Sequence, residues 1–439
     1  MGSFPEDHIY QYDPAPGVKL LIDKIPLARG AAIGFWFPFG SAHEKDNERG
    51  LSHFTEHMLF KGSGERDARE FSRTFDRFGG YINAFTEREA ICFHGLVPVK
   101  HVDIAVSMIM DMIYKPKLGK ADFEKEKNVI INEILSSEDD IEESAQDEFL
   151  ALVYKGHPAS RKIAGRLADI KNASHAALCE FHDKKIRQGS LVITIAGNLD
   201  PDRMAEQVFA YIQKIGSRHH YAIKDKFFPV FNKERKMIKA SGSQVYFFYA
   251  SALSAKLEQD EFWQLSIANS AYGESMSSRL FMHLREEEGL CYNIGSSLYL
   301  SPYIALWAVS SATTQRQFPV FANAYLQEAQ SFFAGGLSRE ELAEAVSRME
   351  GSILLASDDP EFRMKRLARQ FIYDGSCEPV SVTRDRIVAV KDPDRINTLV
   401  KRNLDPEKAS LLLYGKLGTR TAKTGRDIFG AEEGEASES

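Results

Sequence analysis

Residues 50–62 read Gly-Leu-Ser-His-Phe-Thr-Glu-His-Met-Leu-Phe-Lys-Gly, a stretch in which His53, Glu56 and His57 form the pattern His-x-x-Glu-His. Positions i, i+3 and i+4 of a helix share one face, so a helix here would bring both imidazoles and the carboxylate together. For a chain with 12 histidines, composition gives roughly 0.03 matches to this pattern by chance. The alternative is a pair of histidines whose polar atoms are satisfied in the core.

Two imidazoles one turn apart can bind one metal ion, and imidazole is a preferred ligand of zinc. A catalytic zinc site has three protein ligands and one open position, so a third ligand is expected elsewhere in the chain. Glu56 lies on the same turn, where its carboxylate can take a proton from a metal-bound water and pass it to a leaving amine. The pattern therefore predicts metal-dependent hydrolysis.

The helix expected at residues 121–135 offers two acids for the third position. Glu126 and Glu133 are seven residues apart and share a helix face. The neighbours Ile131 and Ile134 indicate partial burial of the Glu133 carboxylate. The residues alone leave both roles open, because acids on a charged helix are most often solvated.

The chain alternates between segments typical of strands and segments typical of helices. In the first half, strands are expected at 18–22, 31–37, twice within 81–98 and at 191–196, and helices at 50–60, 68–78, 102–113 and 121–135. The second half repeats this order, with strands expected at 244–250, 291–300, 304–310 and 411–414, and helices at 261–288, 317–334 and 339–355. The sequence thus predicts a repeat of about 220 residues, with its boundary near residues 224–235.

Composition and charge restrict the functional class. The chain has 439 residues, of which 44% are hydrophobic and 27% charged, as in a soluble globular protein of two or three domains. A net charge of −7 argues against a nucleic-acid partner, and no apolar run approaches the roughly 18 residues of a membrane span. The first residues, MGSFPEDHIYQYD, resemble neither a signal peptide nor a transit peptide, and the four cysteines form no CxxC pair. We therefore expect a cytoplasmic protein without disulfides or a membrane partner.

The pattern at residues 53–57 resembles the HxxEH motif of the inverzincin peptidases of the M16 family. The resemblance covers residues 10–415 and includes the run Gly79-Gly80-Tyr81-Ile82-Asn83-Ala84-Phe85-Thr86. It implies an α+β fold, the M16/LuxS-like metallohydrolase fold, with two homologous domains that each have a mainly antiparallel sheet covered by helices. These domains are expected at 1–223 and 236–415, and the polar residues 416–439 are expected to be a disordered tail.

The resemblance also implies a role for each residue of the site. One zinc ion per chain would be bound by His53, His57 and Glu133, with Glu56 as the general base. Glu126 matches a second acid that supports the site without being a main ligand. The edge strand that pairs with the backbone of a peptide substrate would comprise Asn83, Ala84, Phe85 and Thr86.

In the second half, Arg285 and Tyr292 match an Arg and a Tyr that hold the substrate at the zinc in active relatives. The Tyr292 hydroxyl could also stabilise an oxyanion. The alternative is an exposed helical Arg and a packed Tyr. The second half has no His-x-x-Glu-His, because Glu261-Phe262-Trp263-Gln264-Leu265 stands where the repeat would place it. That domain is therefore expected to bind no metal.

These features predict a zinc metalloendopeptidase that cleaves short or unfolded peptides. The alternative is a non-catalytic scaffold or partner subunit; relatives of that kind usually lose a ligand, the base or the Arg/Tyr pair, whereas this chain keeps all of them. A metal-storage protein would give no reason for Glu56. Because one chain carries both the zinc residues and the pair Arg285 and Tyr292, we expect a homodimer with two sites, each completed by the other chain.

Overall fold

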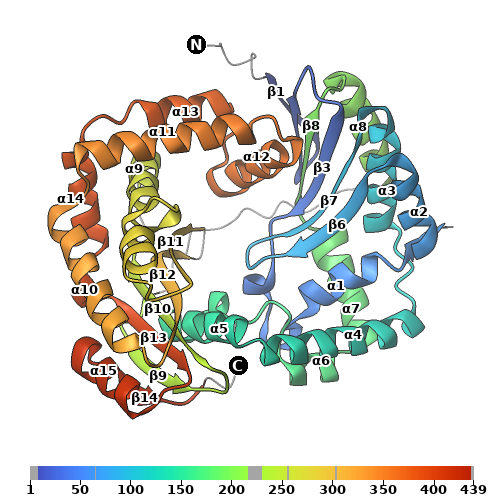
Figure 1. Cartoon of the computed structure of the whole chain (residues 1–439). Coiled ribbons are helices and arrows are strands. Elements are labelled where there is room, and N and C mark those ends of the chain that lie inside the picture. The colour runs from blue at the N-terminus through green and yellow to red at the C-terminus, as the bar shows by residue number, and fades with distance from the viewer. Residues whose placement is uncertain (1–7, 65, 216–229, 255–256, 302–303, 437–439) are drawn as a thin grey trace. The chain divides into compact units, whose positions relative to one another are not determined.

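The computed structural model describes residues 8–64, 66–215, 230–254, 257–301 and 304–436 (Figure 1). The chain forms two compact units, each with an α+β architecture. Unit 1 comprises Met1–Leu135, Lys162–Lys226 and Ile353–Thr383, and unit 2 comprises Ser136–Arg161, Phe227–Ser352 and Arg384–Ser439. Each unit has a mainly antiparallel sheet covered by helices, which confirms the expected fold class.

The sheet of unit 1 has the strand order β1-β2-β8-β3-β7-β6. Neighbouring strands are antiparallel except for the parallel pair β2 and β8. Strand β6 forms one edge, since it pairs only with β7 among the described residues. The strand bounds are β1 His8–Ala15, β2 Val18–Lys24, β3 Gly30–Phe37, β6 Tyr81–Thr86, β7 Ile91–Pro98 and β8 Leu191–Gly197, and a small hairpin adds β4 Gly62–Ser63 and β5 Arg66–Asp67.

Helices cover both faces of this sheet, because alternate side chains of its central strands are apolar on either side. Phe35 of β3 belongs to the core formed with α2, α3 and α8, whereas Trp36 belongs to the core formed with α12 on the opposite face (Figure 1). A further helical core joins α1, α4, α6 and α7. The helix bounds are α1 Leu51–Leu59, α2 Ala68–Phe78, α3 Val102–Tyr114, α4 Lys120–Asp139, α6 Leu167–Asn172, α7 His175–Phe181, α8 Pro201–Ile215 and α12 Pro360–Asp374.

The sheet of unit 2 has the strand order β11-β12-β10-β13-β9-β14. Helix α5 covers one face through Phe149, whose ring stacks on Phe248 at 5.3 Å. The other face packs on α10 and α15, where Phe247 contacts Phe321 and Phe429. The strand bounds are β9 Arg235–Lys239, β10 Gln244–Ala252, β11 Asn293–Leu300, β12 Ala305–Thr314, β13 Ser410–Gly415 and β14 Glu432–Gly434. The helix bounds are α5 Ile141–Val153, α9 Gln259–Asn269, α10 Phe318–Gly335, α11 Arg339–Ala356, α13 Val380–Val388, α14 Pro393–Asn403 and α15 Thr419–Phe429.

The two units do not coincide with the continuous halves expected from the sequence. Helix α5 comes from the first half and packs in unit 2, and α12 comes from the second half and packs in unit 1. Each helix completes the second face of a sheet whose strands lie elsewhere in the chain. Part of the expected boundary, residues 224–229, lies outside the described residues.

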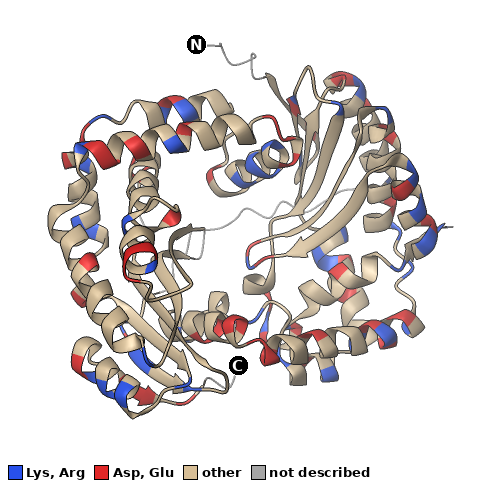
Figure 2. Ribbon diagram, in the orientation of Figure 1, with Lys and Arg blue, Asp and Glu red and all other residues tan. Residues whose placement is uncertain are grey.

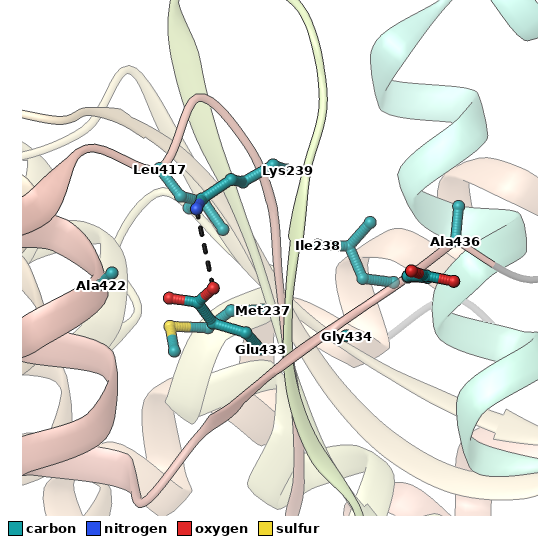
Figure 3. A pocket seen from close by; sticks show the side chains of 9 residues that line it. Met237, Ile238, Lys239, Leu417, Ala422, Glu433, Gly434 and Ala436 are labelled. Carbon is teal, nitrogen blue, oxygen red and sulfur yellow. Dashed lines mark ion pairs between the residues drawn. The ribbon is translucent and has the colours of Figure 1, made fainter.

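The expectation of a disordered tail after residue 415 was wrong for the described part of that segment. Helix α15 buries Thr421, Ala422, Gly425 and Phe429, so one aromatic ring and small residues are enough to dock it. Strand β14 then pairs in parallel with β9. A pocket of about 300 Å³ lies between β9, α15 and the tail, where Lys239 and Glu433 form an ion pair of 3.6 Å (Figure 3).

The regular elements expected from the sequence otherwise agree with the structure to within a few residues, except that residues 261–288 are divided into α9 and two π-helical turns, Ser270–Glu274 and Phe281–Glu287. Acidic and basic residues are interspersed along the helices, whereas most strand residues are uncharged (Figure 2). All four cysteines are free, as expected. Within the described ranges, no helix is long and apolar enough to cross a membrane.

Candidate metal centre

Helix α1 carries the His-x-x-Glu-His pattern and is oriented by its apolar face. Leu51, Phe54 and Met58 are buried in the helical core with α4. The ring of Phe54 stacks on Phe123 of α4, with ring centroids 4.7 Å apart and planes 7° from parallel. Burial of this face leaves the histidines on another face of α1, where both imidazoles are about one fifth exposed.

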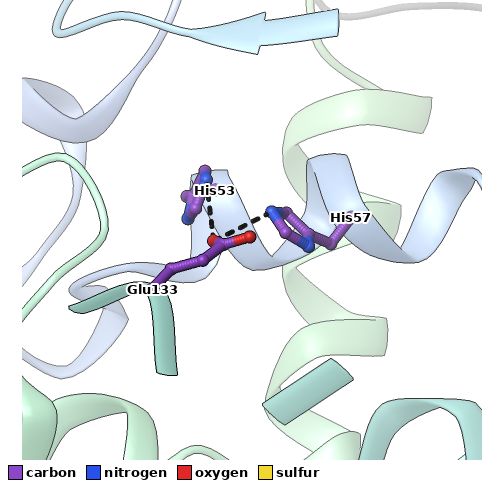
Figure 4. A group of neighbouring side chains, drawn as sticks. All are labelled: His53, His57 and Glu133. Carbon is purple, nitrogen blue, oxygen red and sulfur yellow. Dashed lines mark ion pairs between the residues drawn. The ribbon is translucent and has the colours of Figure 1, made fainter. Parts of the chain in front are cut away.

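The structure brings His53, His57 and Glu133 together (Figure 4). Oε2 of Glu133 lies 3.5 Å from Nε2 of His57 and 4.0 Å from Nε2 of His53, and the three potential donor atoms lie within 4.8 Å of one another. Donor atoms around a tetrahedral zinc ion, with ligand bonds of about 2.1 Å, are about 3.4 Å apart. The three side chains therefore fit a zinc ion with only small side-chain adjustments.

Glu126 lies on the other side of the His57 ring. Its Oε2 is 3.2 Å from Nδ1 of His57, and its Oε1 is 2.6 Å from Nζ of Lys61. A proton on Nδ1 that is donated to Glu126 leaves the lone pair of Nε2 directed toward the metal position. Glu126 is thus placed to orient a ligand, while Glu133 offers the free carboxylate.

The sequence indicated partial burial of Glu133 and gave no indication for Glu126. Glu126 is buried, whereas the Glu133 side chain is 47% exposed. Glu126 lies beneath His57 and Lys61, and the apolar neighbours of Glu133 point into the core without covering its carboxylate. An exposed carboxylate is still suitable as a ligand, because an open metal site must be reached by substrate.

Glu56 stands on the same helical turn and is held by a residue of the sheet edge. The hydroxyl of Thr86 donates a hydrogen bond of 2.5 Å to Oε2 of Glu56. Burial raises the pKa of Glu56 above its ordinary value, although the Thr86 hydrogen bond opposes this shift. Burial and the neighbouring His57 lower the pKa of His53 to about 4, so this imidazole is neutral and able to bind a metal at neutral pH.

Strand β6, the expected substrate-binding strand, is an edge strand of unit 1. On its inner side Asn83 is paired with His94 and Ala84 with Phe93, in an antiparallel register. The Asn83 side-chain oxygen accepts a hydrogen bond of 2.9 Å from the N–H of Ala84. The outer side of β6 has no strand beside it among the described residues, and its last residue, Thr86, touches Glu56.

Arg285 and Tyr292 lie together in unit 2. The guanidinium of Arg285 lies 5.5 Å from the ring centroid of Tyr292 and 4.3 Å from that of Phe281. Tyr292 is 82% exposed, so the alternative of a packed tyrosine does not apply. Arg285 lies in the second of the two π-helical turns that follow α9, Phe281–Glu287.

Sequence reasoning gave no role to Lys61 and did not anticipate the bond between Thr86 and Glu56. Lys61 follows His57 by four residues, a spacing at which side chains of a helix lie on one side, although α1 itself ends at Leu59. No local pattern joins Thr86 to Glu56, which are 30 residues apart and meet only in the folded sheet.

Two family models match the chain. Residues 19–166 match the model described as Insulinase (Peptidase family M16), and residues 172–349 match the model described as Peptidase M16 inactive domain. Together these matches include most of the chain. The residues that match the second model contain no His-x-x-Glu-His.

Curated proteins of similar sequence are named as zinc proteases. The chain is 27% identical over 412 residues to a Bacillus subtilis protein named uncharacterized zinc protease YmxG, over 93% of this chain and 99% of that protein. It is 27% identical over 406 residues to an uncharacterized zinc protease of Mycobacterium leprae, over 90% of this chain and 89% of that protein.

Solved structures share the fold at low sequence identity. A protease from Helicobacter pylori superposes with a TM-score of 0.83 at 13% identity, over 93% of this chain and 99% of that chain. A peptidase M16 inactive domain from Pseudomonas fluorescens superposes with a TM-score of 0.79 at 17% identity, over 93% of this chain and 98% of that chain. By its family matches and its fold, the chain belongs to peptidase family M16.

Proposed function

We propose that the protein is a zinc-dependent endopeptidase that hydrolyses short or unfolded peptides, with one zinc ion per chain bound by His53, His57 and Glu133. The spacing of the three donor atoms supports this assignment, as does the hydrogen bond that orients His57 through Glu126. The names of the relatives, which are called zinc proteases, support the same metal and reaction.

Each residue of the site has a separate chemical task. A zinc ion held here would polarise the scissile carbonyl and lower the pKa of a water molecule. Glu56 accepts a proton from the attacking water, and the oxygen of that water bonds to the carbonyl carbon. Glu56 then returns the proton to the peptide nitrogen as the C–N bond breaks, giving a carboxylate and an amine.

The free edge of β6 supports an extended substrate. A peptide that adds to this edge as a strand is held by main-chain hydrogen bonds, which recognise an extended backbone more than particular side chains. The bond between Thr86 and Glu56 connects this edge directly to the proposed base. Peptides that are already unfolded can pair in this way, whereas a tightly folded protein would first have to open.

Arg285 and Tyr292 are proposed to complete the site in a homodimer, in which each chain supplies this pair to the zinc residues of the other. The contact between the Arg285 guanidinium and the exposed Tyr292 ring supports a joint role in binding substrate. The competing proposal is a non-catalytic subunit, which is favoured only by the description of the second domain as inactive.

One observation carries the proposed activity: Glu56 stands beside the two histidines of α1 and is hydrogen-bonded to the end of an open sheet edge. The test is cleavage of a quenched peptide library by the wild type and by Glu56→Gln, with the cuts mapped by mass spectrometry and zinc measured in both preparations. We expect cleavage by the wild type, a loss of about 10³-fold or more in the variant, and equal zinc content. Zinc-loaded wild type that cleaves no peptide would favour the non-catalytic subunit.

A further inference from the structure

A buried carboxylate lies at the start of the helix that carries the metal motif. Glu44 is only 6% exposed. Its Oε2 accepts a hydrogen bond of 2.9 Å from the N–H of Gly50, and its Oε1 accepts one of 2.7 Å from the N–H of Ser52. Both donors belong to the N-terminus of α1. The N-cap residue of this helix is Gly50, which has no side chain that could cap it.

The first turn of α1 is also fixed by close packing of the Gly50 backbone against Ala164 and Gly165. Gly50 has a φ of 80°, and a Cβ there would lie 2.6 Å from the carbonyl oxygen of Ala164. Gly165 packs directly on the Gly50 backbone, because a Cβ at Gly165 would lie 3.0 Å from the Gly50 Cα. The helix therefore starts at a point set by close backbone packing and by the two hydrogen bonds to Glu44.

This first turn contains a metal-binding residue. His53 is the third residue of α1 and directly follows Ser52, whose N–H is held by Glu44. Glu133 and Glu126 lie on another helix, α4, so the donor atoms meet only if α1 is held at one position and rotation relative to α4. Phe54 against Phe123 fixes the middle of α1, and Lys61 with Glu126 fixes its end. Glu44 is the corresponding contact at its beginning.

A carboxylate is an unusual choice for this purpose. Helix N-termini are ordinarily capped by an exposed Ser, Thr, Asp or Asn that immediately precedes the helix. Here the cap comes from six residues upstream and is buried, although burial of a carboxylate is costly unless it is hydrogen-bonded. Glu44 offers two oxygens at once, and its negative charge interacts favourably with the helix dipole.

We propose that Glu44 is a positioning residue of the metal centre, which fixes the first turn of α1 and thereby holds His53 where it can share a zinc ion with His57 and Glu133. This inference rests on the proposed zinc site but not on peptidase activity. An amide in place of the carboxylate keeps the volume, yet one of the two N–H groups would then face an NH₂ donor.

The test compares the full-length wild type with Glu44→Gln and with a control, Glu48→Gln. Glu48 lies in the same loop, and its partly exposed carboxylate accepts a hydrogen bond of 3.1 Å from the N–H of Lys45. The control therefore makes the same charge change at a carboxylate that does not bond the N–H groups of Gly50 and Ser52. Zinc affinity is measured at pH 8 by competition with a chromophoric chelator, and thermal unfolding is measured on metal-free protein. Outer contacts to metal ligands typically contribute 10–100-fold to affinity.

We expect zinc to bind Glu44→Gln at least about tenfold more weakly than wild type and Glu48→Gln within about twofold. Among zinc-loaded molecules, kcat should fall while KM stays constant, because Glu44 is not placed to touch substrate. If Glu44→Gln does not fold, Glu44→Asp, which keeps the charge but is shorter, should show the same direction of change. Wild-type zinc affinity in a folded Glu44 variant would overturn the inference, whereas a wild type that binds no zinc would overturn the proposed function instead.

Discussion

The hydroxyl of Thr86, at the end of edge strand β6, donates a 2.5 Å hydrogen bond to the carboxylate of Glu56 on α1. A carboxylate on a helix surface can ordinarily adopt several rotamers. This bond selects one of them and places the proposed base beside the strand on which a peptide would add. The side chain of Glu56 is thus oriented by the same element that would orient the substrate.

Replacement of Thr86 by valine should therefore reduce catalysis without removing zinc. The two side chains have nearly the same shape, and only the hydroxyl is lost. We expect kcat to fall about tenfold, a fraction of the 10²–10⁴ that a positioned general base contributes. Steady-state kinetics and zinc content are the measurements.

The matched control for that substitution is Thr74→Val on α2. The Thr74 hydroxyl donates to the carbonyl oxygen of Glu70, outside the metal centre. This variant should have the kcat of the wild type. An unchanged kcat in Thr86→Val would show that Glu56 needs no such support.

The two acids of α4 should differ in their effect on the metal. Glu133→Ala removes a proposed ligand, so we expect loss of bound zinc and of activity while the fold is kept. Glu126→Ala removes the group that orients His57 and pairs with Lys61, so affinity should fall by about 10–100-fold without complete loss. Zinc binding is measured by chelator competition and the fold by circular dichroism. Retention of tight zinc binding by Glu133→Ala, with loss in Glu126→Ala, would exchange the two roles.

Glu44 should give the protein a pH-dependent stability. Burial raises the pKa of this carboxyl from its ordinary 4.5 to about 7 in the fold, against the opposing effect of its hydrogen bonds to Ser52 and Gly50. Between these values the folded protein retains a proton that the unfolded chain has released. The protonated form therefore contributes stability that is complete below pH 4.5 and is lost as the pH rises through 7.

The comparison that isolates this group is the free energy of unfolding of wild type minus that of Glu44→Gln. It should decrease between pH 5 and pH 7, by at most about 1.4 kcal/mol per pH unit, and become constant above pH 8. Urea unfolding at four pH values, with metal removed by a chelator, measures this difference. The contributions of the other titrating groups are nearly the same in both proteins and largely cancel. A difference that rises with pH would mean that the hydrogen bonds outweigh the effect of burial.

Helix α12 should depend on one buried ion pair. Arg363 donates to both oxygens of Asp23 on β2, at 2.7 and 2.6 Å, and the two side chains are 6% and 3% exposed. Removal of one partner from a buried pair leaves an unpaired charge and costs about 3–5 kcal/mol. We expect a loss of this size for Asp23→Ala in urea unfolding of metal-free protein.

The same helix provides the control. Arg369 is half exposed and pairs with Glu87 at 2.7 Å, so Glu87→Ala should cost less than about 1 kcal/mol. If the two alanine variants were equally stable, the buried pair would not be what anchors α12 to the sheet.

The sequence predicted most strands and helices because their apolar residues recur at strand or helix spacing. It did not predict which sheet a helix covers. Phe149 in α5 and Met364 in α12 both give their helices an apolar face, and that face carries no information about whether the sheet beneath it is near or far along the chain. The assignment of domains by continuous halves failed for this reason.

The sequence did not show which of the two candidate ligands is covered, and the reason is local. Ile131 and Ile134 lie close to Glu133 in the sequence, yet successive residues on a helix are about 100° apart, so residues close in sequence can lie in different environments. Glu126 is covered by His57 of α1 and by Lys61, which follows that helix, a contact that depends on how α1 and α4 pack. The ligand types and their spacing could be predicted, but not which carboxylate is covered.

The proposed dimer can be tested by complementation. Glu56→Gln and Tyr292→Phe should each be nearly inactive alone, and Tyr299→Phe, which changes another exposed tyrosine of unit 2, should keep full activity. When the two inactive variants exchange subunits at random, half of the dimers are mixed, and each mixed dimer has one site with both Glu56 and Tyr292 intact. Peptidase activity should therefore recover to about a quarter of the wild-type value. Sites completed within one chain would give no recovery despite demonstrated exchange, and a monomeric active enzyme would exclude the dimer altogether.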